Sequence, residues 1–206
     1  MNGSDPLDRL VKAFRSLPGV GRRSAERMAR KVVLDADAGG RELVHALEEA
    51  LSRVCACSQC GHITLATEDP CRLCSSPDRD DGVLCVVEES GDIELIEASG
   101  AFRGRYHALM GKLSPRKHQG PADLRIDRLM QRIDAGGVKE VILALNSDVE
   151  GDATARYLLE ILSGKRVKAS RLGLGLPAGG GITYADPITL ARAMAGRQPI
   201  EDPGRG

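Results

Sequence analysis

Four of the six cysteines stand in two Cys-x-x-Cys pairs, with ten residues between the pairs. A tetrahedral zinc ion binds four thiolates at about 2.3 Å, and two such pairs supply them from two tight turns. The segment between the pairs is short and polar, so we expect the metal to provide its stability. The spacing predicts a structural zinc site with the ligands Cys57, Cys60, Cys71 and Cys74.

Two other states of these cysteines stay open, namely disulfides and free thiols. The chain starts with "MNGSDPLDRL", which has neither the basic start nor the apolar run of a secretory signal. We therefore expect a reducing compartment, which disfavours disulfides. Cys55 is a competing ligand that breaks the symmetry of the pairs. We expect Cys85 to be a buried thiol in an apolar strand and His62 to lie on the surface.

The stretch "LPGVGRRSAERMA" (17–29) joins two expected helices through a tight glycine turn. Gly19 and Gly21 permit backbone angles that other residues avoid, and they let another chain approach closely. The second helix begins with unpaired N–H groups that favour a phosphate. One of its faces is basic and carries Arg23, Arg27, Arg30 and Lys31. The pattern favours a helix-hairpin-helix site for a nucleic-acid backbone over an ordinary glycine turn beside a solvated basic face.

Acidic residues follow two expected strands at the point where each strand ends. Glu88 and Glu89 follow "VLCVV", and "NSDVEGD" (146–152) follows "EVILAL". Because ligands of open α/β sheets lie beyond the carboxyl ends of the strands, Glu88, Asp148 and Glu150 can converge there on a divalent cation such as magnesium. A solvated acidic loop, with Asp152 as the cap of the next helix, explains these residues equally well. From the residues alone the choice between the two stays open.

Several other kinds of site are disfavoured. The glycine run at 173–181 lacks the Gly-Lys-Ser/Thr ending of a phosphate loop and the spacing of a dinucleotide site, so we interpret it as a turn. The four histidines form no pattern with a serine or cysteine nucleophile. With two Phe, three Tyr and no Trp, a binding surface of stacked aromatic rings is not expected.

The formal net charge of zero hides a segregation of charge. Residues 9–31 hold eight basic side chains and one acid, whereas residues 64–101 hold ten acids and two arginines. A neutral protein with such a basic end can still bind a polyanion. No stretch approaches the roughly 20 apolar residues of a membrane span, and we expect a soluble, cytoplasmic protein.

The elements that must position these residues follow from hydrophobic periodicity. Apolar residues at helical spacing predict helices at 5–16, 24–34 and 41–54, and the chain after residue 77 alternates between strands and helices. We expect strands at 83–89, 106–111, 138–145 and 167–175 and helices at 92–99, 122–133, 153–163 and 188–196. This alternation predicts an α/β fold with parallel strands whose faces are covered.

The order of these parts resembles the RecR family of bacterial recombination mediators over about residues 7–197. The resemblance rests on "LPGVGRRSAERMA", the paired cysteines, "CVVEESGDI", "YHALMGKLSP", "VEGDATARYL" and "LPAGGGITYADPITLARAM". It implies a helix-hairpin-helix domain at 1–54, a four-cysteine zinc finger at 55–77 and a Toprim domain with a parallel sheet at 78–172. A C-terminal segment with a glycine loop, a helix and a tail would follow at 173–206.

The resemblance also implies a function. RecR proteins form homotetrameric rings that can encircle DNA, and they act with RecO, and in some settings RecF. Together they load the RecA recombinase onto single strands, coated by single-strand binding protein, at gaps during DNA repair. The resemblance implies that Arg23 and Arg27 contact DNA and that Glu150, with Glu88 beside it, serves partner and DNA interactions. The location it implies is the bacterial cytoplasm, at the nucleoid.

Toprim enzymes bind magnesium through a strand-end Glu and an Asp-x-Asp motif, which match Glu88, Asn146 and Asp148 here. Asn146 replaces a carboxylate by an amide, which lowers the affinity for a hard cation. We therefore expect at most weak magnesium binding and no catalysis. The competing hypothesis is a magnesium-dependent nuclease or primase-like enzyme. A zinc module of the transcription type is disfavoured because no sequence-reading helix stands beside the cysteines.

Overall fold

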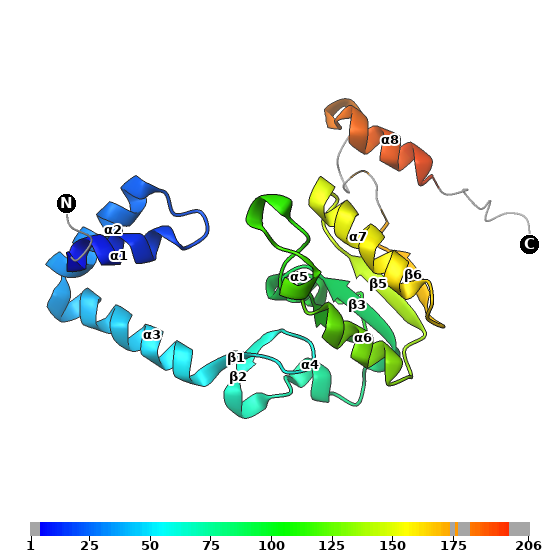
Figure 1. The fold of residues 1–206 in the computed structure, drawn as a ribbon, viewed down its shortest axis with the longest axis horizontal. Coiled ribbons are helices and arrows are strands. Elements are labelled where there is room, and N and C mark those ends of the chain that lie inside the picture. The colour runs from blue at the N-terminus through cyan, green and yellow to red at the C-terminus, as the bar shows by residue number, and fades with distance from the viewer. Residues whose placement is uncertain (1–4, 174–175, 177–181, 198–206) are drawn as a thin grey trace, which may run out of the picture. The chain divides into compact units, whose positions relative to one another are not determined.

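The chain divides into two compact units, one made of Met1–Cys55 and Thr64–Thr67 and the other of Ala56–Ile63 and Glu68–Gly206. The structure, a computed structural model, describes residues 5–173, 176 and 182–197 (Figure 1). Most of the glycine run at 173–181 and the expected tail therefore lie outside the described residues.

The N-terminal unit is helical, as expected. It contains α1 (Pro6–Arg15), α2 (Arg22–Leu34), the π-helical turn η1 (Ala36–Gly40) and α3 (Arg41–Arg53). Asp5 caps α1 by accepting the N–H of Leu7 at 3.0 Å, and Pro6 stands in the first turn, where no N–H is needed. Helix α2 begins at Arg22, two residues earlier than predicted, directly after the glycine turn.

The core of this unit is shallow. Ala25 and Ala29 are fully buried, and α1 packs against α2. Met28 of α2 is 38% exposed although the apolar periodicity of this helix predicts burial. Leu47 and Leu51, which share one face of α3, are 53% and 84% exposed, so α3 presents an apolar face that this unit does not cover.

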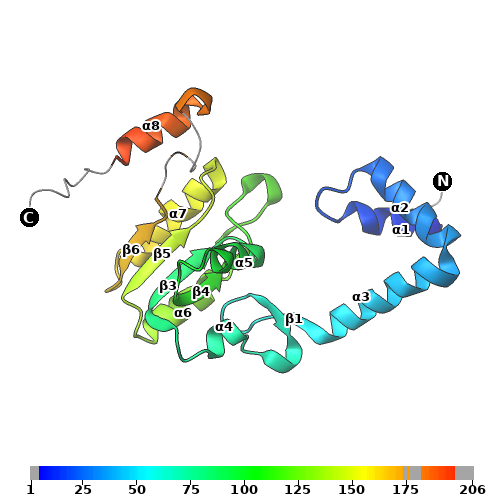
Figure 2. The same cartoon turned by 180° about the vertical axis from the view of Figure 1, so that it is seen from behind.

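The second unit is built on a four-stranded sheet in the order β4-β3-β5-β6 (Figures 1 and 2). The strands are β3 (Asp80–Val87), β4 (Gly104–Ala108), β5 (Glu140–Ala144) and β6 (Lys168–Arg171). All three pairings are parallel, which confirms the prediction, and Val86 pairs with His107 on one side and Leu143 on the other. The carboxyl ends of β3 and β5 therefore meet at one edge of the sheet.

Both faces of the sheet are covered, because alternate strand residues point to opposite sides. On one face, Leu84, Val86, Val141 and Leu143 pack with α6 (Ile126–Asp134) and α7 (Val149–Leu162). On the other face, Cys85, Val87 and Tyr106 pack with Ile93 of α5 (Ser90–Ser99) and with all four paired cysteines. The cysteine segment is thus part of the core of this unit.

The remaining elements are short. Strands β1 (Val54–Ala56) and β2 (Ile63–Leu65) form a two-stranded sheet, and η2 (Ala66–Glu68) and α4 (Arg72–Ser75) complete the cysteine segment. The 3-10 turns η3 (Pro115–Lys117) and η4 (Pro121–Asp123) precede α6, so this helix begins later than predicted. After η5 (Ile182–Tyr184), Asp186 caps α8 (Pro187–Ala195). No helix in the described ranges is long and apolar enough to cross a membrane.

Candidate metal centre, basic turn and acidic strand ends

The four paired cysteines come together in one cluster. Their sulfur atoms all lie within 4.8 Å of one another. The Sγ atoms of Cys57 and Cys74 are 3.9 Å apart, and those of Cys60 and Cys71 are 3.5 Å apart. A tetrahedral zinc ion with bonds of about 2.3 Å places its sulfur ligands about 3.8 Å apart, so the donor set fits a zinc ion.

The backbone of the first pair forms the tight turn that this cluster needs. The N–H of Gly61 donates to the carbonyl of Cys57 at 2.9 Å, and Gly61 has a φ of +84°, a conformation that favours glycine. The backbone N–H of His62 donates to the Cys60 sulfur at 3.4 Å, and that of Cys71 donates to the Cys57 sulfur at 3.3 Å. These N–H donors stabilise negative charge on the sulfurs, as a cluster of thiolates requires.

The other sulfur and imidazole groups of this region do not join the cluster. Cys85 is 2% exposed and its burial raises its pKa to about 12, which confirms the predicted core thiol. Cys55 is not part of the four-sulfur group. His62, predicted on the surface, is half-buried, and its Nδ1 has no hydrogen-bond partner among the described residues.

Two arginines that the sequence did not single out hold the cluster in place. Arg125 donates from Nη2 to the carbonyls of Cys57 and Ser58, at 3.4 and 3.0 Å. Arg105 donates from Nη1 to the carbonyls of Leu73 and Cys74, both at 2.8 Å. Both cysteine turns thus receive a guanidinium, which places positive charge beside the thiols.

The glycine turn of the N-terminal unit has the open geometry that a backbone-binding site requires. Gly19 has a φ of +75°, and a Cβ at either Gly19 or Gly21 would meet nothing within 4 Å. Gly21 is the N-cap of α2, and no side chain caps this helix. The first N–H groups of α2 therefore have no side-chain cap among the described residues, at the positive end of the helix dipole.

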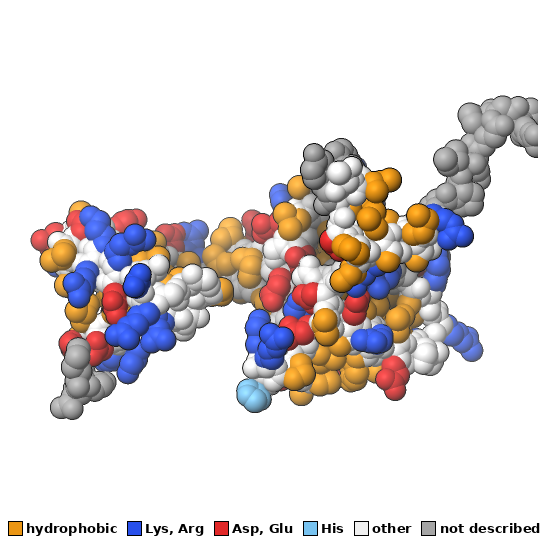
Figure 3. Space-filling view, turned by 90° about the horizontal axis from the view of Figure 1, so that it is seen from above, with side chains coloured by type: hydrophobic (Ala, Val, Ile, Leu, Met, Phe, Trp, Pro, Cys, Tyr) orange, Lys and Arg blue, Asp and Glu red, His pale blue; other side chains and the backbone are white. Residues whose placement is uncertain are grey.

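The predicted DNA-contacting arginines are the unpaired ones on this helix. Arg22 bonds to Glu26 at 2.9 Å and Lys31 pairs with Asp35 at 3.2 Å. By contrast, within the described chain Arg23, Arg27 and Arg30 make no ion pair, and all three are exposed. Lys and Arg side chains gather on the face of the N-terminal unit that Figure 3 presents. The arrangement can bind a polyanion through its backbone charge.

The acidic residues do lie where β3 and β5 end, but basic and amide groups satisfy them. Glu88 is 3% exposed, and its two carboxylate oxygens accept from the backbone N–H and the side-chain amide of Asn146, both at 2.8 Å. The Nζ of Lys112 lies 3.4 Å from Glu88 and 2.5 Å from the Oδ2 of Asp148. This hydrogen bond lowers the pKa of Asp148 and raises the pKa of Lys112.

Glu150, the third predicted acid, points to a different partner. Its Oε1 accepts from the hydroxyl of Ser114 at 2.6 Å. In the part of the chain that the structure describes, the four cysteines are the one group of three or more potential ligands close enough to share a metal ion. An ammonium group, Lys112, thus stands between Glu88 and Asp148, where a cation would bind two carboxylates.

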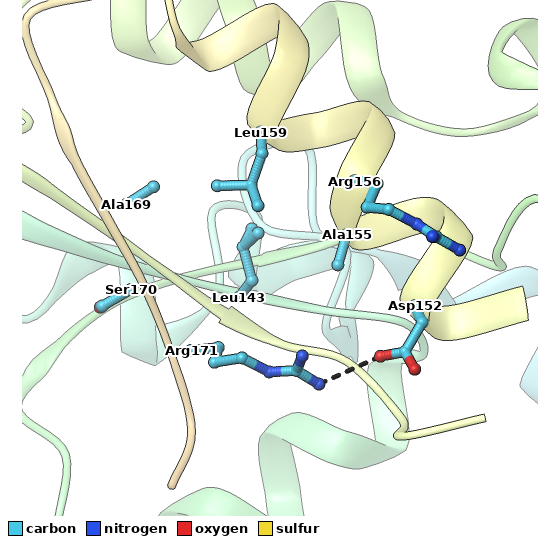
Figure 4. Close-up of a pocket in the computed structure, with 8 residues that line it drawn as sticks. All are labelled: Leu143, Asp152, Ala155, Arg156, Leu159, Ala169, Ser170 and Arg171. Atoms are coloured by element: carbon cyan, nitrogen blue, oxygen red, sulfur yellow. Dashed lines mark hydrogen bonds and ion pairs between the residues drawn. The ribbon is translucent and has the colours of Figure 1, made fainter. Parts of the chain in front are cut away.

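The interpretation of the acidic residues as a solvated loop predicted Asp152 as the cap of helix α7. This prediction was wrong, because Asp148 caps the helix. The Oδ1 of Asp148 accepts from the N–H of Gly151 at 2.7 Å. Asp152 instead accepts from Arg171 at 3.2 Å and from Arg192 of α8 at 3.1 Å. Figure 4 shows Asp152 turned toward Arg171 beside a cavity of about 430 Å³ that β5, β6 and α7 line. Asp152 therefore joins three elements of this unit.

Comparison with known protein families agrees with these parts. Residues 7–51 match the family model described as RecR, helix-hairpin-helix; residues 82–173 match the Toprim domain, and residues 175–198 match RecR, C-terminal. These matches cover the basic turn, the acidic strand ends and α8, and together they confirm the fold class predicted from the sequence.

Curated relatives match almost the whole chain. The protein named Recombination protein RecR from Moorella thermoacetica is 47% identical over 96% of this chain and 98% of its own length. Proteins of the same name from Thermobifida fusca and Syntrophobacter fumaroxidans are 46% and 45% identical, over 95% and 93% of this chain and 97% and 94% of their own. At this identity and coverage, the chain belongs to the RecR family.

Proposed function

We propose that this chain is a recombination mediator that holds DNA by its backbone charge. The observation that carries the proposal is the glycine turn before α2. Among the described residues, no side chain caps this helix, and three of its exposed arginines have no carboxylate partner. Like charges that stay unpaired on one helix face repel one another, and a bound polyanion removes this repulsion. The names of the relatives support recombination as the process in which the DNA is bound.

The test is DNA binding by the full chain, measured by fluorescence anisotropy. In the variant with Arg23→Glu and Arg27→Glu, two phosphate contacts are lost, and each contributes about 0.7 to the salt slope for a single strand. This corresponds to about 25-fold weaker binding at 0.1 M salt, before any repulsion by the new carboxylates. The matched control changes two exposed arginines of the other unit, Arg103→Glu with Arg166→Glu. Equal affinity of the two variants would overturn the contact assignment.

The acidic strand ends support a role without bond breaking. Asn146 supplies an amide where Toprim enzymes have a carboxylate, and the ammonium of Lys112 already offsets part of the charge of Glu88 and Asp148. Binding of a divalent cation would have to break both ion pairs that this ammonium makes. We infer that magnesium binds weakly at most and that Glu150 serves contacts with DNA or a partner protein. The competing hypothesis of a nuclease or primase-like enzyme predicts magnesium-dependent cleavage or priming instead.

The cysteine cluster supports zinc as a structural cofactor. Four converging sulfurs within the core of the α/β unit, with backbone N–H groups directed at them, suit a closed structural site. Bound zinc would tie the two cysteine turns to each other and to the face of the sheet that carries Cys85 and Tyr106. Metal content and melting temperature, before and after a chelator, measure this role.

The partners belong to the same proposal. We infer that the chain assembles with copies of itself and acts with RecO, and in some settings RecF, to load RecA at gaps coated by single-strand binding protein. The exposed apolar face of α2 and α3, which includes Val33, Val44, Leu47 and Leu51, supports self-association through the N-terminal unit. Solution mass with and without DNA and RecO tests assembly and partner use together.

The chain also divides into four proposed domains or segments. We propose a helix-hairpin-helix domain at 1–54, a zinc finger at 55–77, a Toprim domain at 78–172 and a C-terminal segment at 173–206. The family matches at 7–51, 82–173 and 175–198 support three of these ranges.

A further inference from the structure

A second basic site lies in the α/β unit, away from the acidic strand ends. A cavity of about 780 Å³ opens between the first cysteine turn and α6. Three arginines line it, Arg105, Arg128 and Arg132, together with polar side chains of Ser58, Gln59 and Gln131. Asp81 is the one acid in this lining, and it already accepts from the Nε of Arg105 at 2.6 Å.

In the described part of the chain, Arg128 and Arg132 have no carboxylate partner, and several of their side-chain N–H groups make no hydrogen bond. Neither forms an ion pair with any described residue, and each uses a single nitrogen within the unit. The Nη1 of Arg128 donates to the carbonyl of Ser58 at 3.0 Å, and the Nη1 of Arg132 donates to the carbonyl of Tyr106 at 2.6 Å. The Nε and Nη2 groups of both side chains make no hydrogen bond within the described ranges, so each arginine keeps N–H groups for a ligand.

Support of the first cysteine turn does not use all the N–H groups of these two residues. Arg125 reaches the carbonyls of Cys57, Ser58 and Gln59, and Arg128 adds one bond to Ser58 through its Nη1. Arg125, Arg128 and Arg132 stand at i, i+3 and i+7, which places three positive charges on one face of the same short segment. The cysteine sulfurs offset the charge of Arg125, but Arg128 and Arg132 repel each other at i and i+4 and form no ion pair with a described residue. An anion in the cavity would supply a counter-charge.

The lining selects the chemistry of the anion. A guanidinium presents planar N–H pairs that match the oxygens of a phosphate, and two of them can hold one phosphodiester group from two sides. No aromatic side chain in the described part of the chain lines the cavity, so its lining offers no platform on which a base can stack. We propose that Arg128 and Arg132 bind the phosphate backbone of DNA, as a second contact site on the α/β unit. This inference rests on the proposed function, since it takes DNA as the polyanion.

The test removes the charge and keeps the hydrogen-bond donors. In the full chain, Arg128→Gln with Arg132→Gln still offers amide donors to Ser58 and Tyr106. The logarithm of DNA affinity is measured against the logarithm of salt concentration, and the slope should fall by about 1.4 for a single strand, which is about 25-fold in affinity at 0.1 M salt. Arg128→Lys with Arg132→Lys restores the charge and should restore the slope. Arg103→Gln with Arg166→Gln is the matched control and should leave it unchanged.

The outcomes separate this inference from the proposed function. If the unaltered chain binds DNA and the change of Arg23 and Arg27 weakens binding, but the glutamine variant has the slope of its control, the second site is refuted and the first stands. If the unaltered chain binds no DNA, both fail. Zinc content and melting temperature establish that the glutamine variant is folded. Should it unfold, Arg128→Gln alone, at an exposed position, must lower the slope by about 0.7.

Discussion

Gly151 is the residue whose replacement should disturb the acidic strand ends most directly. A Cβ at this position would lie 2.1 Å from the backbone oxygen of Asn146 and 2.9 Å from the Oε1 of Glu88. Neither neighbour can move freely, because Glu88 is buried and its carboxylate accepts two hydrogen bonds from Asn146. Gly151 itself is held in place because its N–H donates to Asp148. Gly151→Ala therefore forces the start of α7 away from the end of β5.

The expected cost follows from these contacts. Overpacking against held backbone costs about 1–3 kcal/mol, and loss of the Asp148 cap costs about 1 kcal/mol. The intrinsic preference of a helix for Ala over Gly returns about 0.5–1 kcal/mol. The net loss of about 1–3.5 kcal/mol lowers the melting temperature of a chain of this size by about 2–14 °C.

The assay is thermal unfolding followed by circular dichroism, with Gly91→Ala as the matched control. Gly91 also lies in the first turn of a helix of the α/β unit, but a Cβ there meets nothing within 4 Å. The control should be as stable as the unaltered chain or slightly more stable. If Gly151→Ala melts together with the control, the close approach of α7 to the strand end is wrong.

Three further predictions concern the charged and metal-binding groups. Lys112→Met removes the ammonium between Glu88 and Asp148, so calorimetry should detect tighter magnesium binding than in the unaltered chain. Equal affinity of the two proteins, or no binding in either, contradicts the account of Lys112. Because the pKa of Asp148 is lowered from 3.8, its stabilisation is complete above about pH 5 and is lost as the pH falls through the folded value. The melting temperature of Asp148→Asn should then vary less between pH 5 and 3. Cys60→Ala with Cys74→Ala should abolish zinc binding and destabilise the α/β unit, and unchanged melting without zinc would contradict a structural role.

Local patterns in the sequence were enough to predict those features of the structure that depend on residues close together along the chain. The two Cys-x-x-Cys pairs identified the four sulfurs that come together in the structure, because each turn is set by four consecutive residues. The glycine turn and the basic helix after it were visible for the same reason. Alternation of strands and helices was enough to predict a parallel sheet, since a crossover helix makes neighbouring strands run in the same direction.

Contacts between distant residues could not be predicted in this way. Glu88 binds Asn146, which lies 58 positions later, and Lys112 reaches Asp148 across 36 positions. Arg125 holds a cysteine turn 67 positions earlier. Composition and periodicity give no sign of such pairs, and they decide whether carboxylates face a metal ion or an internal lysine. The exposed face of α3 also escaped prediction, because an apolar stripe indicates burial without saying against which surface.

The most direct test of the central claim is the salt dependence of DNA affinity, measured with two oligonucleotides of unrelated sequence and equal length. Binding through backbone charge predicts equal affinities and a steep linear fall of log affinity with log salt, with a slope of about 0.7 for each phosphate contact on a single strand. The DNA should remain intact when magnesium is added. A slope near zero, a strong preference for one sequence or cleavage of the DNA would contradict the account.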